Sequence, residues 1–106
     1  MSVIMTLQVA GDPAKVEEYA AANEEQMQAI LEAAKGHGLL AHRFYGTDDG
    51  KIMVVDEWPD AESFQAFFAE QQEQINPIME AAGAAGEPEV NFWRRLEAHD
   101  EYGWDA

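Results

Sequence analysis

The sequence contains no cysteine, which excludes a disulfide framework and any thiolate metal site. This absence is consistent with the reducing cytosol, so we expect a cytoplasmic protein. Its three histidines, at positions 37, 42 and 99, are scattered and form no HxH or HExxH spacing, so no metal site is expected. The chain also lacks a glycine-rich phosphate loop and a GxSxG nucleophile elbow.

Basic residues are scarce, with six Lys and Arg against 21 Asp and Glu, for a net charge of −15. Such a surface repels phosphate backbones and anionic lipids, so we expect neither nucleic acid nor a membrane as a partner. No apolar run approaches the ~20 residues of a membrane helix. The apolar segment 1–9 is short and has no basic start, which favours a strand over a signal peptide.

The length of 106 residues predicts a single domain spanning residues 1–106. The hydrophobic pattern alternates between strand and helix periods and predicts the order strand, helix, strand, strand, helix, strand. A segment at 97–106 is expected to form an acidic tail. The strands are expected at 2–9, 39–46, 51–58 and 89–96.

The first helix is predicted over residues 13–35, with Asp12 as its N-cap and Pro13 at its first position. The second helix begins after Asp60. Pro77 is expected to kink or break it, leaving 77–82 as a separate turn before a linker at 83–88.

A three-residue hairpin loop with Gly50 in the left-handed conformation would join the second and third strands. Thr47 would then pair with Lys51, and counting back places His42 opposite Asp56. The same count places Phe44 opposite Val54 and Leu40 opposite Trp58. A loop of two or four residues would change this pairing.

The predicted sheet is apolar on both faces, because Met53 and Val55 alternate with Ile52 and Val54. Two helices can cover only one of these faces. Leaving the second face in water would cost about 25 cal/mol per Å² of apolar surface. Pairing with a second copy of the chain removes that cost, so we expect a homodimer. The aromatic residues of the tail either reach the partner or belong to a frayed terminus.

The segment from Val54 to Phe64 reads Val-Val-Asp-Glu-Trp-Pro-Asp-Ala-Glu-Ser-Phe, a strand ending in Asp, Glu and Trp that is followed by a capped helix. With this segment, the chain resembles the antibiotic biosynthesis monooxygenase-like superfamily from its first strand to its fourth. The resemblance implies an α+β fold, a ferredoxin-like βαββαβ monomer whose four-stranded antiparallel sheet carries two helices on one face. Two such monomers form a dimeric α+β barrel.

Members of this superfamily include cofactor-independent monooxygenases acting on small quinol-like aromatics, haem-degrading enzymes and proteins without an assigned activity. Their pocket lies between sheet and helices, and a Trp matching Trp58 lines it in several of them. Many carry a His in the second helix where this chain has Phe67-Phe68-Ala69, which argues against haem. The quinol-oxidising branch often has a Tyr at the place of Phe64, which has no hydroxyl. We expect no cofactor.

His42 and Asp56 are the candidate catalytic residues. His42 would be a general base oriented by the Asp56 carboxylate, or else half of a structural His–Asp pair. The alternative for Asp56 is a structural ion pair with Arg43 or Arg94. Trp58 offers a flat surface for an aromatic ligand, and core packing is the alternative.

Four further residues are candidates for binding a substrate. Asn23 falls on the apolar stripe of the first helix, where its amide would bond either a ligand carbonyl or a neighbouring backbone group. Phe44, Phe64 and Phe68 would hold an apolar or aromatic ligand, or simply fill the core.

Two functions remain open at this point. The first is a cofactor-independent oxygenase in which His42 deprotonates a small aromatic or quinol-type metabolite. The second is a non-catalytic homodimer that binds a small molecule or has only a structural role. A cavity of a few hundred Å³ touching His42 and Trp58 would favour an enzyme or a small-molecule binder, and a core closed by phenylalanines would favour a purely structural role.

Overall fold

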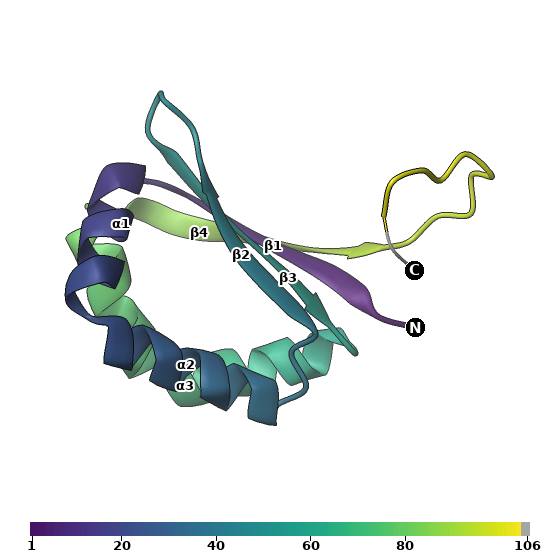
Figure 1. The fold of residues 1–106 in the computed structure, drawn as a ribbon, viewed down its shortest axis with the longest axis horizontal. Coiled ribbons are helices and arrows are strands. Elements are labelled where there is room, and N and C mark those ends of the chain that lie inside the picture. The colour runs from purple at the N-terminus through teal and green to yellow at the C-terminus, as the bar shows by residue number, and fades with distance from the viewer. Residues whose placement is uncertain (105–106) are drawn as a thin grey trace.

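The computed structural model describes residues 1–104, a four-stranded antiparallel sheet with helices on one face (Figure 1). The sheet order is β2-β3-β1-β4, so β2 and β4 are the edge strands. This is the predicted α+β arrangement. The strands are β1 (Val3–Ala10), β2 (Ala41–Gly46), β3 (Lys51–Trp58) and β4 (Ala85–Arg94), and the helices are α1 (Pro13–Ala22), α2 (Glu24–Gly36) and α3 (Ala61–Ala81).

The predicted helix over 13–35 is in fact two helices, which meet at Asn23. Asn23 has φ −133° and ψ 46°, outside the helical region. Its side-chain Nδ2 donates to the carbonyl of Tyr19 at 2.9 Å. An amide that bonds the local backbone competes with the helical ladder, which explains why the helix is interrupted here.

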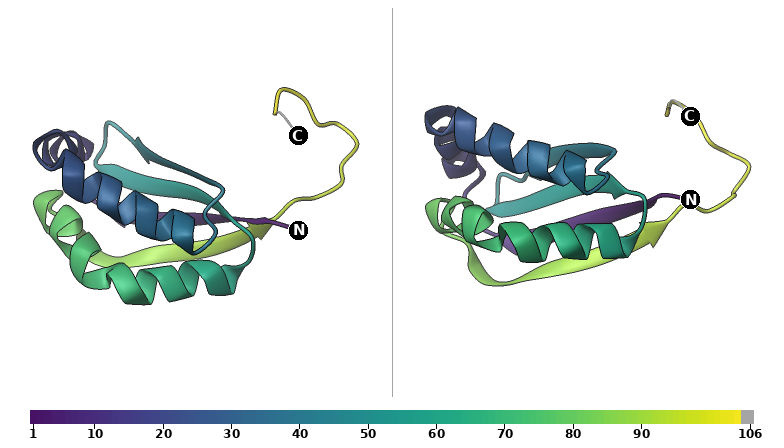
Figure 2. Two further views of the ribbon diagram at one scale, coloured as in Figure 1. Left: turned by 60° about the horizontal axis from the view of Figure 1, so that its bottom comes forward. Right: turned by 90° about the horizontal axis from the view of Figure 1, so that it is seen from below.

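Pro77 does not end α3, which continues from Ala61 to Ala81. The expected separate turn at 77–82 is therefore wrong, although Figure 2 shows the C-terminal part of α3 bending away from the rest. The proline removes one hydrogen bond to the carbonyl of Glu73, an exposed residue. Ile78, directly after the proline, is 4% exposed and anchors the last turn in the core.

The hairpin register is confirmed. The Thr47 amide donates to the Lys51 carbonyl at 2.9 Å, and His42 pairs with Asp56. Gly50 has φ 89°, as the three-residue loop requires. Leu40, by contrast, precedes β2 and is 60% exposed, so it does not belong to the buried face.

The fourth strand begins at Ala85 and ends at Arg94, so the predicted linker at 83–88 is largely strand and Leu96 lies outside it. Pro88 is tolerated because β4 is an edge strand, whose outer amides need no partner in the sheet. The register between β1 and β4 shifts between Gln8 and Ala10. This irregularity lets the glycine-containing start of β4 pair with the end of β1.

The core lies between the sheet and the helices and has two clusters. The larger joins sheet residues such as Met5 and Trp58 to Phe64 and Phe67 of α3. The smaller contains Val9, Val16, Ile52 and Ala82. Phe44 of the edge strand β2 packs against both clusters. Within residues 1–104, no helix is long and apolar enough to cross a membrane.

The opposite face of the sheet is partly apolar, as expected. Ile4, Tyr45 and Trp93 are 37%, 47% and 52% exposed, and Met53 and Val55 are half-buried. The described part of the acidic tail, 97–104, leaves the sheet beyond β4 and extends away from the body (Figure 1). Residues 105–106 of the predicted tail lie outside the described part of the chain.

Candidate functional site

A cavity of about 90 Å³ lies between the sheet, α2 and α3, and we call it the inner cavity. Its walls are almost wholly apolar, and among residues 1–104 only His42 and Asp56 bring ionisable groups to them. Apolar side chains reach the cavity from the sheet and from two helices. They include Val54 from β3, Met27 and Ile30 from α2, and Phe64, Phe68 and Met79 from α3.

His42 and Asp56 form a hydrogen bond of 2.7 Å between Nδ1 and Oδ1. They are direct partners in the β2–β3 ladder, so their side chains leave the same face of the sheet. Asp56 is 5% exposed, whereas the His42 side chain is 33% exposed. Because Nδ1 faces the carboxylate, Nε2 of His42 is the nitrogen left to accept a proton.

Trp58 donates its indole Nε1–H to Oδ2 of Asp56 at 3.1 Å. Residues two apart on a strand share a face, which brings this donor to the carboxylate. The two Asp56 oxygens therefore have different donors, Trp58 and His42. This contact was not predicted, although the Asp-x-Trp spacing on a strand contains the signal for it.

Trp58 itself does not line the inner cavity. It is 0% exposed, and its ring packs against Phe64 and Phe67 at centroid distances of 5.8 and 5.4 Å. The expected stacking surface for a ligand is thus covered by aromatic side chains of α3. The structure gives Trp58 a hydrogen-bonding role behind the wall of the cavity.

The expected ion pair between Asp56 and an arginine is not formed. Arg43 donates to the Tyr45 hydroxyl at 3.2 Å, and this bond raises the pKa of the Arg43 guanidinium. Asp56 is partnered by His42 and Trp58 instead. Among residues 1–104, every buried side-chain nitrogen or oxygen has a hydrogen-bond partner.

Three of the predicted binding residues reach the inner cavity, namely Phe44, Phe64 and Phe68. The rings of Phe44 and His42 meet edge to face at 5.3 Å, and those of Phe64 and Phe68 stack at 5.5 Å. Asn23 does not line the cavity and instead bonds the backbone at the junction of α1 and α2.

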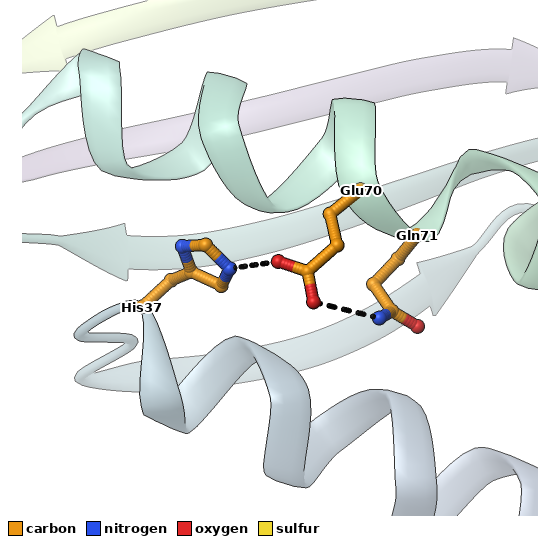
Figure 3. A network of polar contacts seen from close by, with 3 residues as sticks. All are labelled: His37, Glu70 and Gln71. Atoms are coloured by element: carbon orange, nitrogen blue, oxygen red, sulfur yellow. Dashed lines mark hydrogen bonds and ion pairs between the residues drawn. The ribbon is translucent and has the colours of Figure 1, made fainter.

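A second pair of a histidine and a carboxylate joins α2 and α3, the two helices that line the inner cavity. His37, which caps the C-terminus of α2, contacts Glu70 of α3 through Nε2 and Oε2 at 2.5 Å (Figure 3). The hydrogen bond from His37 lowers the pKa of Glu70 below its usual range. No local pattern predicts this pair, because the two residues are 33 positions apart.

Two observations on residues 1–104 concern the binding of haem and of metal ions. Phe67, in the stretch that the superfamily resemblance compares with a haem-ligating histidine, is 6% exposed in the core. No group of three or more His, Asp or Glu side chains that could hold a metal ion occurs in residues 1–104.

Solved structures share this fold. A monooxygenase of Streptomyces coelicolor, ActVA-Orf6, solved with nanaomycin D, is 18% identical, with a TM-score of 0.66 over 92% of this chain and 89% of that one. SnoaB, a cofactor-independent oxygenase of Streptomyces nogalater, is 16% identical, with a TM-score of 0.59 over 94% and 98%.

A protein of Bordetella bronchiseptica designated an antibiotic biosynthesis monooxygenase is 14% identical, with a TM-score of 0.67 over 91% of this chain and 98% of that one. No protein-family model and no curated protein sequence matches the chain. The chain therefore has the fold of the antibiotic biosynthesis monooxygenase-like proteins, which confirms the resemblance at the level of the fold.

Proposed function

We propose that the protein is a cofactor-independent monooxygenase-like enzyme acting on a small aromatic or quinol-type metabolite. One observation carries the proposal. His42, whose Nδ1 is held by Asp56, lines with it a cavity whose other walls are apolar. A base in such surroundings suits a substrate with an aromatic body and one acidic hydroxyl or C–H group.

In the proposed reaction, Nε2 of His42 takes a proton from an activated CH₂ group or its enol. The resulting carbanion passes an electron to dioxygen, and the two radicals combine to form a C–O bond. The peroxide anion formed in this way takes back the proton held on Nε2 of His42, and loss of water from the resulting hydroperoxide then yields a carbonyl. Overall, CH₂ and O₂ become C=O and H₂O, so dioxygen is the only oxidant required. The apolar side chains of Phe44, Phe64 and Phe68 would keep water from the intermediate.

The fold comparisons support the same class of reaction, because solved proteins of this fold include a monooxygenase and a cofactor-independent oxygenase. The acidic surface favours substrates without phosphate or carboxylate groups.

The test measures dioxygen uptake with anthrones and naphthohydroquinones, together with product analysis by mass spectrometry. General base catalysis contributes about 10²–10⁴-fold, so His42→Ala should lower the rate by a factor in that range. His99→Asn is the matched control. This substitution removes an exposed histidine of the tail and suits its φ of 60°. Equal rates for wild type and His42→Ala would refute the proposed base.

A second function is favoured by the size of the inner cavity. At about 90 Å³ it is smaller than the ~300 Å³ of typical small-molecule sites. It is also smaller than the ~150 Å³ of a cavity that admits benzene. A non-catalytic homodimer with a filled core is the function that this observation favours. Absence of ligand binding together with absence of dioxygen uptake would select it.

Self-association is proposed for either function. The outer face of the sheet carries Ile4, Tyr45 and Trp93 with 37% or more of each exposed. Burying such apolar surface against a second copy is worth about 25 cal/mol per Å². The same face repeats on each copy, as a two-fold interface requires.

A further inference from the structure

A second pocket, of about 340 Å³, lies between the start of α1 and the β2–β3 hairpin, and we call it the outer pocket. Its apolar side is formed by Pro13, Val16 and Ile52, and its polar side by residues that include Glu17 and Asp48. Unlike the inner cavity, it reaches the size range of small-molecule sites.

Phe44 is the one side chain within residues 1–104 that lines both the inner cavity and the outer pocket. It also packs against both core clusters, so it stands at the junction between them. The ring meets His42 edge to face on the inner side. A rotation of this single ring would therefore open a path from the outer pocket to the candidate base.

The position of Phe44 permits such a rotation. It is only half-buried, and its strand β2 is an edge strand with β3 as its sole neighbour in the sheet. Phenylalanine has two side-chain torsions, and a half-buried ring on an edge strand is less tightly held than a ring inside the core. Phe64 and Phe67, at 5% and 6% exposed, are held in the core by contrast.

We propose that the outer pocket is the binding site through which an aromatic ligand reaches His42, and that the ring of Phe44 is the gate between the two spaces. The inference rests on the proposed function only for the role of His42 as the group that the ligand must reach. It also explains how a ligand could bind although the inner cavity alone is too small for it. Such a ligand would occupy both spaces once the ring of Phe44 turns.

The lining of the outer pocket specifies the chemistry of this ligand. An aromatic body fits against Val16 and Ile52, and the acceptors Glu17 and Asp48 favour hydroxyl or amine donors at its edge. A carboxylate or phosphate would meet two carboxylates of like charge. The ligand is therefore an uncharged or cationic hydroxy-aromatic compound.

The test uses 2-naphthol as the probe and 2-naphthoate as its anionic counterpart, without dioxygen. Phe44→Ala should bind 2-naphthol at least ten times more tightly than wild type, with amide shifts at Val16 and Ile52 in NMR spectra. Phe44→Trp should weaken binding. The anion should bind at least ten times more weakly than 2-naphthol to every variant.

Phe92→Ala is the matched control, since Phe92 lies on the other edge strand and lines neither space. Phe44→Leu provides a milder truncation that should also tighten binding. Unchanged affinity in both Phe44 variants, or shifts absent from Val16 and Ile52, would overturn the inference. Tight binding without dioxygen uptake would uphold it while refuting the proposed reaction.

Discussion

The Trp58 indole nitrogen donates to Oδ2 of Asp56 at 3.1 Å, while His42 contacts the other oxygen at 2.7 Å. The carboxylate is thus fixed at both ends and has little freedom to rotate. A fixed acceptor holds the imidazole in one orientation and one tautomer, with the proton on Nδ1. Trp58 accordingly positions the candidate base without touching the cavity.

Trp58→Phe should destabilise the protein by about 1–3 kcal/mol, because a buried carboxylate oxygen loses its donor. Urea unfolding measures the change. Trp93→Phe is the control, since its indole also donates, to Thr6 Oγ1 at 2.8 Å, but the residue is 52% exposed. The control should change stability by less than half as much. Equal effects of the two substitutions would show that the Trp58 bond has no special role.

The link between His37 and Glu70 should make stability depend on pH. Its hydrogen bond to His37 depresses the pKa of Glu70 in the folded state. The stabilisation is therefore complete above the unfolded pKa of about 4.3 and is lost as the pH falls through the folded pKa. Wild type should exceed Glu70→Gln in stability near pH 6, and the gap should narrow steadily as the pH falls below about 4.3.

Urea unfolding at a series of pH values measures this gap. Glu73→Gln, an exposed change on the same helix, should show no comparable pH dependence. A gap between wild type and Glu70→Gln that persists at low pH would contradict the assigned cause.

Gly46→Ala should destabilise the protein by about 1–3 kcal/mol. A Cβ at this position would lie 2.5 Å and 2.6 Å from the ring of Pro13, at the first turn of α1. Gly36→Ala, where a Cβ meets nothing within 4 Å, should be neutral or stabilising by up to about 1 kcal/mol. Thermal unfolding compares the two, and a harmless Gly46→Ala would mean that α1 does not pack as described.

Val55→Asp tests self-association through the outer face. An unpaired carboxylate buried at an interface should weaken the dimer about 100-fold or more. Sedimentation velocity at micromolar concentration should show wild type as a dimer and this variant as a monomer. Ala29→Asp, on the exposed surface of α2, should remain a dimer. A monomeric wild type would refute the proposed interface.

The parts of the fold set by local pattern could be predicted from the sequence. The loop from Thr47 to Gly50 fixed the hairpin register, and that register placed His42 beside Asp56. The break at Asn23 was missed because an apolar stripe continues across it, and only a side-chain bond to Tyr19 reveals it. Pro77 by itself predicts the end of the helix, but the burial of Ile78 keeps the chain helical beyond it.

Only the part of the candidate site that strand pairing sets could be predicted from the sequence. Strand pairing brings His42 and Asp56 together by counting alone. Whether Trp58 faces a ligand or lies behind the wall depends on how the aromatic residues of α3 pack, which a one-dimensional pattern does not contain. The outer pocket depends on the approach of Pro13 to Gly46 and was not visible in the sequence.

The most direct test of the account is the ¹⁵N NMR spectrum of the three histidines during an anaerobic titration with 1,4-naphthohydroquinone. His42 should carry its proton on Nδ1 before ligand is added, and its Nε2 signal should move as the quinol binds, while His99 stays unchanged. A proton on Nε2 of free His42, or a bound quinol that leaves the His42 signals in place, would contradict the assignment of His42 as the base.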